Sequence, residues 1–127
     1  MGGVHDVVLT TTGLGGDEVV DGSARPLFVA RRDGVALGCG GVLIEGEAAE
    51  LKRFFVSRPG RGRGIGAALV TACEGAARSA GARVLRLETG VYSAAAIALY
   101  RKAGFTPRDA FEPYQPDPWS VFMEKGL

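Results

Sequence analysis

Six residues, Arg61-Gly62-Arg63-Gly64-Ile65-Gly66, form the segment whose residue types and spacing best fit a chemical task. Its glycines let the backbone approach a ligand closely and adopt positive φ angles. The segment stands where a predicted strand passes into a predicted helix, and the unpaired N–H groups at a helix N-terminus bind phosphate. With Arg53 and Arg58, four arginines surround this turn. The segment is therefore suited to a diphosphate.

Other phosphate-binding loops fit the segment less well. The sequence contains no G-x-x-x-x-G-K-[ST] pattern, which excludes a Walker A loop. Gly62, Gly64 and Ala67 do fit the G-x-G-x-x-A dinucleotide fingerprint, and Glu88 ends the next predicted strand. A dinucleotide fold needs several parallel strands, however, and three antiparallel strands are predicted before this loop. A solvated glycine-arginine loop without a ligand is the remaining alternative.

Histidine and cysteine offer little material for catalysis. His5 is the single histidine and stands near the N-terminus, so neither a histidine-dependent triad nor a metal site is expected. Cys39 and Cys73 lie in apolar contexts and are expected to be buried thiols rather than a disulfide. The chemistry is expected to proceed without imidazole.

Composition and charge narrow the class of protein. A chain of 127 residues with 46% hydrophobic residues can bury one core. Fifteen Lys and Arg against 14 Asp and Glu give a net charge of +1, which argues against sequence-independent nucleic-acid binding. No apolar run approaches the ~18 residues of a membrane span, and the first residues lack the features of a signal peptide. We expect a cytoplasmic protein with no nucleic-acid or membrane partner.

Turn residues and periodicity predict the elements that position the glycine-arginine segment. A short strand is expected at residues 7–10, followed by glycine-rich sequence up to residue 26. Strands at residues 27–31, 35–44 and 48–56, joined by the turns Asp33-Gly34 and Glu45-Gly46-Glu47, form an antiparallel meander. After a loop, residues 64–80 show the apolar spacing of a helix that Gly81 ends.

The second half of the chain alternates between strands and helices. A strand is predicted at residues 84–88, a helix at 94–103 with Ser93 as its N-cap, and final strands at 105–107 and 119–125. Three prolines make the connection between these last strands an extended loop. The predicted fold class is α/β, with a mixed, mostly antiparallel sheet and helices on its faces.

Several segments, in this order, resemble the motifs of the GNAT family of N-acetyltransferases. Arg61-x-x-Gly64-x-Gly66 resembles the family motif [QR]-x-x-G-x-[GA], and Ala96-x-x-Leu99-Tyr100-x-x-x-Gly104-Phe105 resembles A-x-x-L-Y-x-x-x-G-F. Residues 49–56 and 118–125 resemble one bacterial branch. The resemblance covers about residues 27–125. It implies a GNAT-like domain that binds acetyl-CoA at residues 27–127, after a shortened, poorly defined N-terminal segment at residues 1–26.

The resemblance implies acetyl-CoA as the cofactor and assigns residues to it. The backbone of the segment Arg61, Gly62, Arg63, Gly64, Ile65 and Gly66 would hold the pyrophosphate of coenzyme A. Phe55 and Val56 would pair with the pantetheine arm, and N–H groups near Phe55 would stabilise the developing oxyanion. Tyr100 matches the tyrosine that protonates the leaving thiolate, which a phenol with a pKa of about 10 can do. The alternative for Tyr100 is a packing role alone.

Glu50 is the candidate general base. An amine is mostly protonated at neutral pH and must lose a proton before it attacks a thioester. Glu50 resembles the glutamate that some family members use for this step, directly or through water. Strand alternation predicts that Lys52 and Phe54 share the face of Glu50 and that this face borders the cleft. The alternative is a glutamate on the surface of the strand.

Three departures from the family pattern concern the cofactor and acceptor. Ser93 replaces an asparagine common in the family, and either contacts coenzyme A or caps its helix. The first 26 residues are too few for the usual first strand and helices, so the acceptor site is expected to be more open, or completed by a partner in a homodimer. Glu112 and Tyr114, with Asp117, lie in the proline-rich loop and are expected either as weak substrate contacts or as loop residues.

The predicted function is an N-acetyltransferase that moves an acetyl group from acetyl-CoA to a primary amine by direct attack in a ternary complex. Neither Cys73, in a helix, nor Cys39, in a strand, demands a covalent intermediate. The acceptor is a small-molecule or peptide amine whose identity the sequence leaves open. The alternative is a non-catalytic or truncated GNAT-like module that binds coenzyme A as a regulator.

Overall fold

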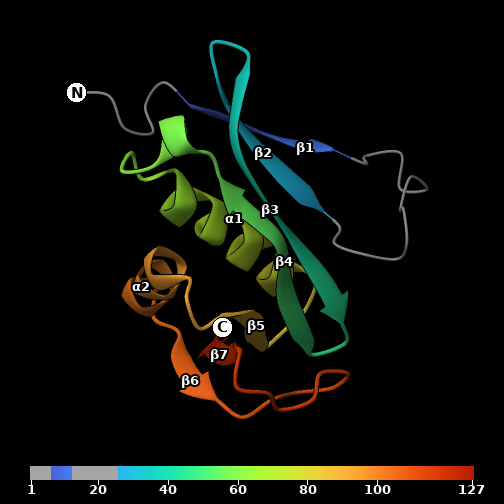
Figure 1. Cartoon of the computed structure of the whole chain (residues 1–127). Helices are drawn as coiled ribbons and strands as arrows, with labels where there is room; N and C mark the ends of the chain where they lie inside the picture. The colour runs from blue at the N-terminus through green and yellow to red at the C-terminus, as the bar shows by residue number, and fades with distance from the viewer. Residues whose placement is uncertain (1–6, 13–25) are drawn as a thin grey trace.

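The computed structural model describes residues 7–12 and 26–127, which form one seven-stranded sheet and two helices (Figure 1). The order across the sheet is β1-β2-β3-β4-β5-β7-β6. Neighbouring strands are antiparallel except for β4 and β5, which are parallel. The predicted mixed, mostly antiparallel sheet is confirmed. The elements are β1 (Val8–Thr12), β2 (Leu27–Arg32), β3 (Val35–Glu45), β4 (Ala48–Val56), the short 3-10 helix η2 (Arg58–Gly60), α1 (Ile65–Ser79), β5 (Val84–Gly90), α2 (Ala94–Lys102), β6 (Thr106–Arg108) and β7 (Ser120–Gly126).

Local turn chemistry explains the meander of β2, β3 and β4. Asp33 and Gly34 have φ angles of 51° and 79°, the paired positive values of a two-residue hairpin turn. Gly81, with φ 94°, follows the end of α1, and Gly104, with φ 102°, follows the end of α2. These glycines stand where the sequence predicts each helix to end.

A β-bulge interrupts β4. Cys39 of β3 pairs with Phe55, whereas Gly41, two residues further along β3, pairs with Lys52, three residues back along β4. The extra residue in β4 is accommodated at Arg53, which has a φ of 55°. Such a bulge bends its strand and changes the alternation of its side chains.

The bulge corrects one prediction about Glu50. Ala49 and Leu51 belong to the core beneath the helices, so Glu50 lies on the opposite face of the sheet. Beyond the bulge, Phe54 packs against the same core cluster as Leu51. The prediction that Phe54 shares the face of Glu50 is therefore wrong, because strict alternation holds only as far as the bulge.

Both helices pack on the face of the sheet that carries Ala49 and Leu51, with α1 beside β3 and β4 (Figure 1). The small residues predicted along α1 allow it to approach the strands closely. Tyr100 brings α2 into the same core. The largest fully buried side chains include Leu69, Val70 and Cys73 of α1 and Leu85, Leu87 and Met123 of the strands.

Residues 109–119 connect β6 to β7 and cover the opposite face. Phe111 and Tyr114 of this connection, which we call the β6–β7 loop, pack on Phe122 of β7, with ring centroids 5.6 and 5.7 Å from it. The sheet therefore has a helical face and a loop face.

The two cysteines are free thiols, as expected. Cys73 is fully buried, and burial raises the pKa of its thiol to about 12. Cys39 is half-buried, and its thiol donates to the carbonyl oxygen of Arg53 at 3.1 Å. Neither the described part of α1 nor that of α2 is long and apolar enough to cross a membrane.

Candidate active site

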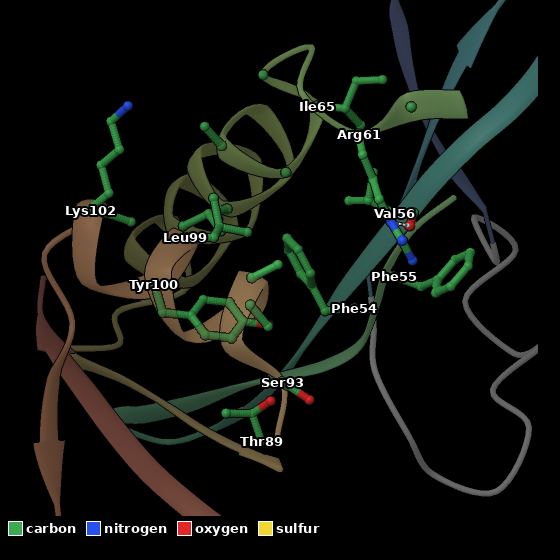
Figure 2. Close-up of a pocket in the computed structure, with 18 of the residues that line it drawn as sticks. Phe54, Phe55, Val56, Arg61, Ile65, Thr89, Ser93, Leu99, Tyr100 and Lys102 are labelled. Atoms are coloured by element: carbon green, nitrogen blue, oxygen red, sulfur yellow. Dashed lines mark hydrogen bonds between the residues drawn. The ribbon is translucent and has the colours of Figure 1, made fainter. Parts of the chain in front are cut away.

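A cleft of about 1010 Å³ opens between α1, α2 and the ends of β4 and β5 (Figure 2). It contains most of the residues that the sequence assigned to the cofactor or to catalysis. Nine of them line it: Phe55, Val56, Arg61, Gly62, Gly64, Ile65, Gly66, Ser93 and Tyr100. The structure thus brings the glycine-arginine segment and the candidate acid, Tyr100, into one cavity.

The N-terminus of α1 lies at one end of this cleft. Gly62 and Gly64 have φ angles of 75° and 78°, values that L side chains rarely adopt. Gly64 is the N-cap residue, so no side chain satisfies the first N–H groups of α1, and its first turn has no acidic residue. A Cβ atom at Gly62 would meet nothing within 4 Å. The free N–H groups and the open space fit a diphosphate.

The chain before this helix is fixed to β3. The carbonyl oxygen of Leu37 accepts from both the N–H and the hydroxyl of Ser57, at 2.8 and 3.0 Å. Gly60 is buried, and a Cβ there would lie 2.8 Å from the same Leu37 oxygen. Close backbone approach at Gly60 therefore positions the segment that follows it.

A parting of β4 from β5 forms the floor of the cleft. The two strands pair at three positions, the last of which is Glu50 with Arg86. Beyond this point β5 stays paired with β7 as far as Gly90, while β4 stays paired with β3. On its other edge, residues 51–56 of β4 have no neighbouring strand in the described sheet. The carbonyl oxygen of Val56 accepts from Nε of Arg61 at 3.3 Å. The other backbone groups on this edge have no strand partner among the described residues and could pair with an extended ligand arm.

Tyr100 lies deep in the cleft, on the helical face. Only 5% of it is exposed, and its ring packs edge-on against Phe54 and Phe105, with centroids 5.7 and 5.8 Å away. Figure 2 shows the rings of Tyr100 and Phe54 side by side. Burial raises the pKa of Tyr100 to about 12. The phenol stays protonated at neutral pH and can donate a hydrogen bond.

Glu50 lies at the point where β4 and β5 part, and it does not line the cleft with Tyr100. It is 5% exposed on the loop face, where the hydroxyl of Tyr114 donates to its Oε2 at 2.5 Å. Burial, followed by this bond to Glu50, raises the pKa of Tyr114. The structure therefore pairs the candidate base with a residue that the sequence placed on the acceptor side.

Arg86, the register partner of Glu50, is a feature that sequence reasoning missed. Its guanidinium lies over the ring of Phe111, 4.5 Å from the centroid. Its Nε atom is buried without a hydrogen-bond acceptor among the described residues. Since the contact joins β5 to the β6–β7 loop, only the folded sheet could reveal it.

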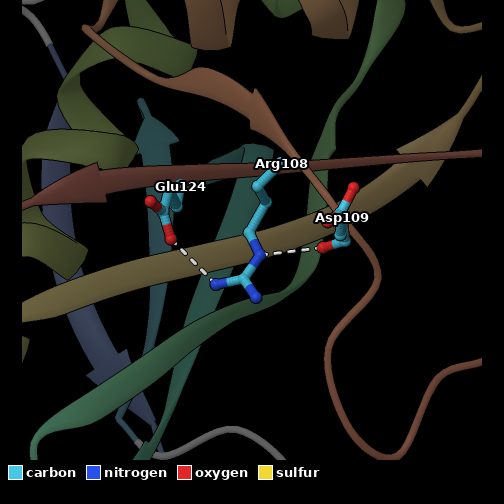
Figure 3. A network of polar contacts seen from close by, with 3 residues as sticks. All are labelled: Arg108, Asp109 and Glu124. Atoms are coloured by element: carbon cyan, nitrogen blue, oxygen red, sulfur yellow. Dashed lines mark hydrogen bonds and ion pairs between the residues drawn. The ribbon is translucent and has the colours of Figure 1, made fainter.

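An ion pair fixes the start of the β6–β7 loop (Figure 3). Arg108 of β6 bonds Glu124 of β7 through Nη1 at 2.8 Å, and its Nε donates to the carbonyl oxygen of Asp109 at 2.8 Å. The loop that carries Phe111 and Tyr114 therefore begins from a fixed point.

The remaining predicted residues divide into those in the cleft and those outside it. Ser93 occupies the N-cap position of α2, but its side chain makes no capping hydrogen bond; it lines the cleft instead. Arg63 and Glu112 are exposed and do not line the cleft. Gly66 lines it and also lets α2 come close, because a Cβ there would lie 2.8 Å from a methyl group of Leu99.

Several lining residues were not predicted. Leu99 and Lys102 face the cleft from α2, and their three-residue spacing was an available signal. Phe54 was assigned to the wrong face because of the bulge. Thr89 and Tyr92 line the cleft because β5 separates from β4 before it reaches them. The neighbouring sequence does not predict that separation.

Comparisons with known proteins agree with this geometry. The model of the Acetyltransferase (GNAT) family matches residues 15–105. An IAA acetyltransferase of Azospirillum brasilense is 54% identical over 102 residues, which is 79% of this chain and 67% of that protein. The structure of a candidate acyl-CoA N-acyltransferase from Klebsiella pneumoniae subsp. pneumoniae superimposes with a TM-score of 0.84 and 34% identity, over 95% of this chain and 97% of that one.

A third protein shares the fold at low identity. It is a GNAT family acetyltransferase from Elizabethkingia anophelis, crystallised with acetyl-CoA bound. Its TM-score is 0.73 at 19% identity, over 97% of this chain and 99% of that one. The family match and the Azospirillum relative show that this chain belongs to the GNAT family of acetyltransferases.

Proposed function

We propose that the chain transfers an acetyl group from acetyl-CoA to a primary amine by direct attack, with both substrates bound together. As a GNAT acetyltransferase the chain uses acetyl-CoA as its donor. The observation that carries the proposal is the cleft that joins the uncapped N-terminus of α1 to Tyr100 along the free edge of β4.

Each part of the cleft has one binding role in this proposal. The N–H groups at Gly62, Gly64 and the first turn of α1, with Arg61, would hold the pyrophosphate. The free edge of β4 at Phe55 and Val56 would pair with the amide groups of the pantetheine arm. Ser93 would contact the cofactor near its acyl end.

Two side chains, those of Tyr100 and Glu50, would act as proton donor and proton acceptor in the reaction. Acetyl-CoA supplies the acetyl group as a thioester with a thiolate leaving group. The buried hydroxyl of Tyr100 would donate a hydrogen bond to that sulfur, because its raised pKa keeps the proton in place. Glu50 would accept the proton of the acceptor amine through a water molecule at the parting of the strands. The N–H groups of β4 near Phe55 would face the acetyl carbonyl oxygen.

An assay of coenzyme A release tests this function. Purified protein and acetyl-CoA are incubated with a panel of primary amines and, separately, with IAA, because a relative is named for it. Thiol should be released in step with acetylated product found by mass spectrometry. Release without any acetylated product would indicate thioester hydrolysis and would contradict acetyl transfer. No release with any acceptor would support the non-catalytic alternative.

A further inference from the structure

Three exposed aromatic side chains lie in or beside the cleft. Phe55, Tyr92 and Trp119 are 57%, 84% and 63% exposed, and they are the exposed aromatic residues of the described chain. Phe55 and Tyr92 line the cleft. Trp119 packs on Tyr92, with ring centroids 6.2 Å apart. We call these three side chains the aromatic rim.

The rim spans the parting of β4 from β5. Phe55 stands on β4 and points away from Phe54 and the helices (Figure 2). Tyr92 follows the end of β5, and Trp119 precedes β7, which is paired with β5. Phe55 therefore stands on one side of the parting, and Tyr92 and Trp119 stand on the other.

Hydrogen bonds hold the Trp119 half of the rim in place. The carbonyl oxygen of Trp119 accepts from the N–H of Val91 at 2.9 Å. The backbone N–H of Trp119 donates to Oδ1 of Asp117 at 2.7 Å. Two exposed rings kept in contact by a fixed backbone form a ready surface for a flat apolar group.

Negative charge lies beside these rings. The hydroxyl of Ser120 is 2.7 Å from Oε2 of Glu88 and 3.0 Å from Oδ2 of Asp117. A hydroxyl has one proton, so it can donate to only one of the two carboxylates. Within the described residues, neither Glu88 nor Asp117 forms an ion pair. This arrangement attracts a cation, and the faces of Tyr92 and Trp119 do so too.

From these observations we infer that the acceptor is an amine carried on a short arm from an aromatic ring, and that the Tyr92–Trp119 pair and Phe55 hold the ring. The inference rests on the proposed acetyl transfer. The carboxylates of Glu88 and Asp117 attract the ammonium group, and the ring contacts then direct the amine to the gap between β4 and β5.

Two measurements on the full chain test this inference. The first compares kcat/KM for 2-phenylethylamine, 2-cyclohexylethylamine and propylamine at saturating acetyl-CoA. We expect the phenyl compound to exceed both others by about 10-fold, the effect of one or two aromatic contacts. Trp119→Ala should remove most of that preference by raising KM with little change in kcat, and Trp119→Phe should retain it. Val35→Ala, at an exposed apolar residue that does not line the cleft, is the control.

The second measurement uses the fact that Trp119 is the single tryptophan. Its fluorescence should change saturably when 2-phenylethylamine is added to the protein with coenzyme A, and should not change with propylamine. Equal kcat/KM values for the three amines, or a phenyl preference that survives Trp119→Ala, would overturn the inference while acetyl transfer stands. If no amine is acetylated, the proposed function fails. The fluorescence titration then decides the aromatic site by itself: a saturable change supports it, and an unchanged signal overturns it.

Discussion

The hydroxyl of Tyr114 donates a 2.5 Å hydrogen bond to Glu50, and this bond joins the β6–β7 loop to the point where β4 and β5 part. Both the burial of Tyr114 and this bond raise its pKa, so the proton stays on the phenol. Glu50 is therefore held beside the parting of β4 and β5 by a hydrogen bond from Tyr114, which keeps its own proton.

Replacing Glu50 tests its proposed role as the base. Glu50→Gln should lower kcat about 100-fold, the usual scale of a lost general base, and should change the pH profile of kcat/KM. Tyr114→Phe removes the positioning bond alone and should lower kcat by a smaller factor. In the double variant the two effects should not add, because both act through one contact. Unchanged kinetics in Glu50→Gln would remove Glu50 from the mechanism.

Tyr100→Phe separates catalysis from packing. The phenylalanine keeps the ring contacts with Phe54 and Phe105 but lacks the proton donor. We expect kcat to fall by about 100-fold, while the Kd for acetyl-CoA, measured by calorimetry, stays within a factor of about two. A variant with unchanged kcat would show that Tyr100 serves only to fill the core.

Buried titratable groups predict how stability depends on alkaline pH. Burial raises the pKa values of Cys73 and Tyr100 to about 12, from ordinary values of 9.0 and 10.0. Between these limits the unfolded chain releases protons that the folded chain keeps, so the free energy of unfolding decreases as the pH rises. Well below pH 9 this loss is absent.

Thermal unfolding measured from pH 8 to 11.5 checks this expectation. The decrease contributed by each group approaches about 1.4 kcal/mol per pH unit where its folded and unfolded forms differ by one proton. Tyr100→Phe should make the decrease above pH 10 shallower. Parallel curves for the variant and the original protein would contradict the assignment.

Two glycine-to-alanine substitutions test the close approach at Gly60. A Cβ there would lie 2.8 Å from a backbone oxygen of Leu37 and 3.2 Å from Ile65, so Gly60→Ala should destabilise the fold by about 1–3 kcal/mol. Gly75, within α1, has nothing within 4 Å of such an atom. Gly75→Ala should therefore stabilise by about 0.5–1 kcal/mol. Denaturant unfolding measures both, and equal effects would rule out the steric explanation.

Local signals explain how far the fold could be predicted from sequence. Asp33-Gly34 specifies a hairpin, Gly81 and Gly104 end helices, and every predicted strand and helix boundary lies within two residues of the observed one. Each of these features depends on a few neighbouring residues. The GNAT motifs located the glycine-arginine segment and Tyr100, which the structure places in one cleft.

The features that escaped prediction depend on distant contacts. The bulge at Arg53 places a residue other than glycine at a positive φ. No glycine or other turn residue in the neighbouring sequence predicts this bulge. It turns Phe54 to the helical face and separates it from Glu50. The contact of Tyr92 with Trp119 also exists only because β5 and β7 are neighbours in the folded sheet.

Calorimetric titration with acetyl-CoA, with NAD as the parallel ligand, tests directly whether the cleft at the N-terminus of α1 binds the cofactor. We expect micromolar binding of acetyl-CoA and no binding of NAD. Gly64→Glu should abolish binding, because it places a carboxylate where the pyrophosphate would lie. Gly81→Glu, at the other end of α1 and also at a positive φ, carries similar backbone strain and should still bind. Loss of binding in both variants alike, or no binding by the unmodified protein, would contradict the assignment of the α1 N-terminus to the cofactor.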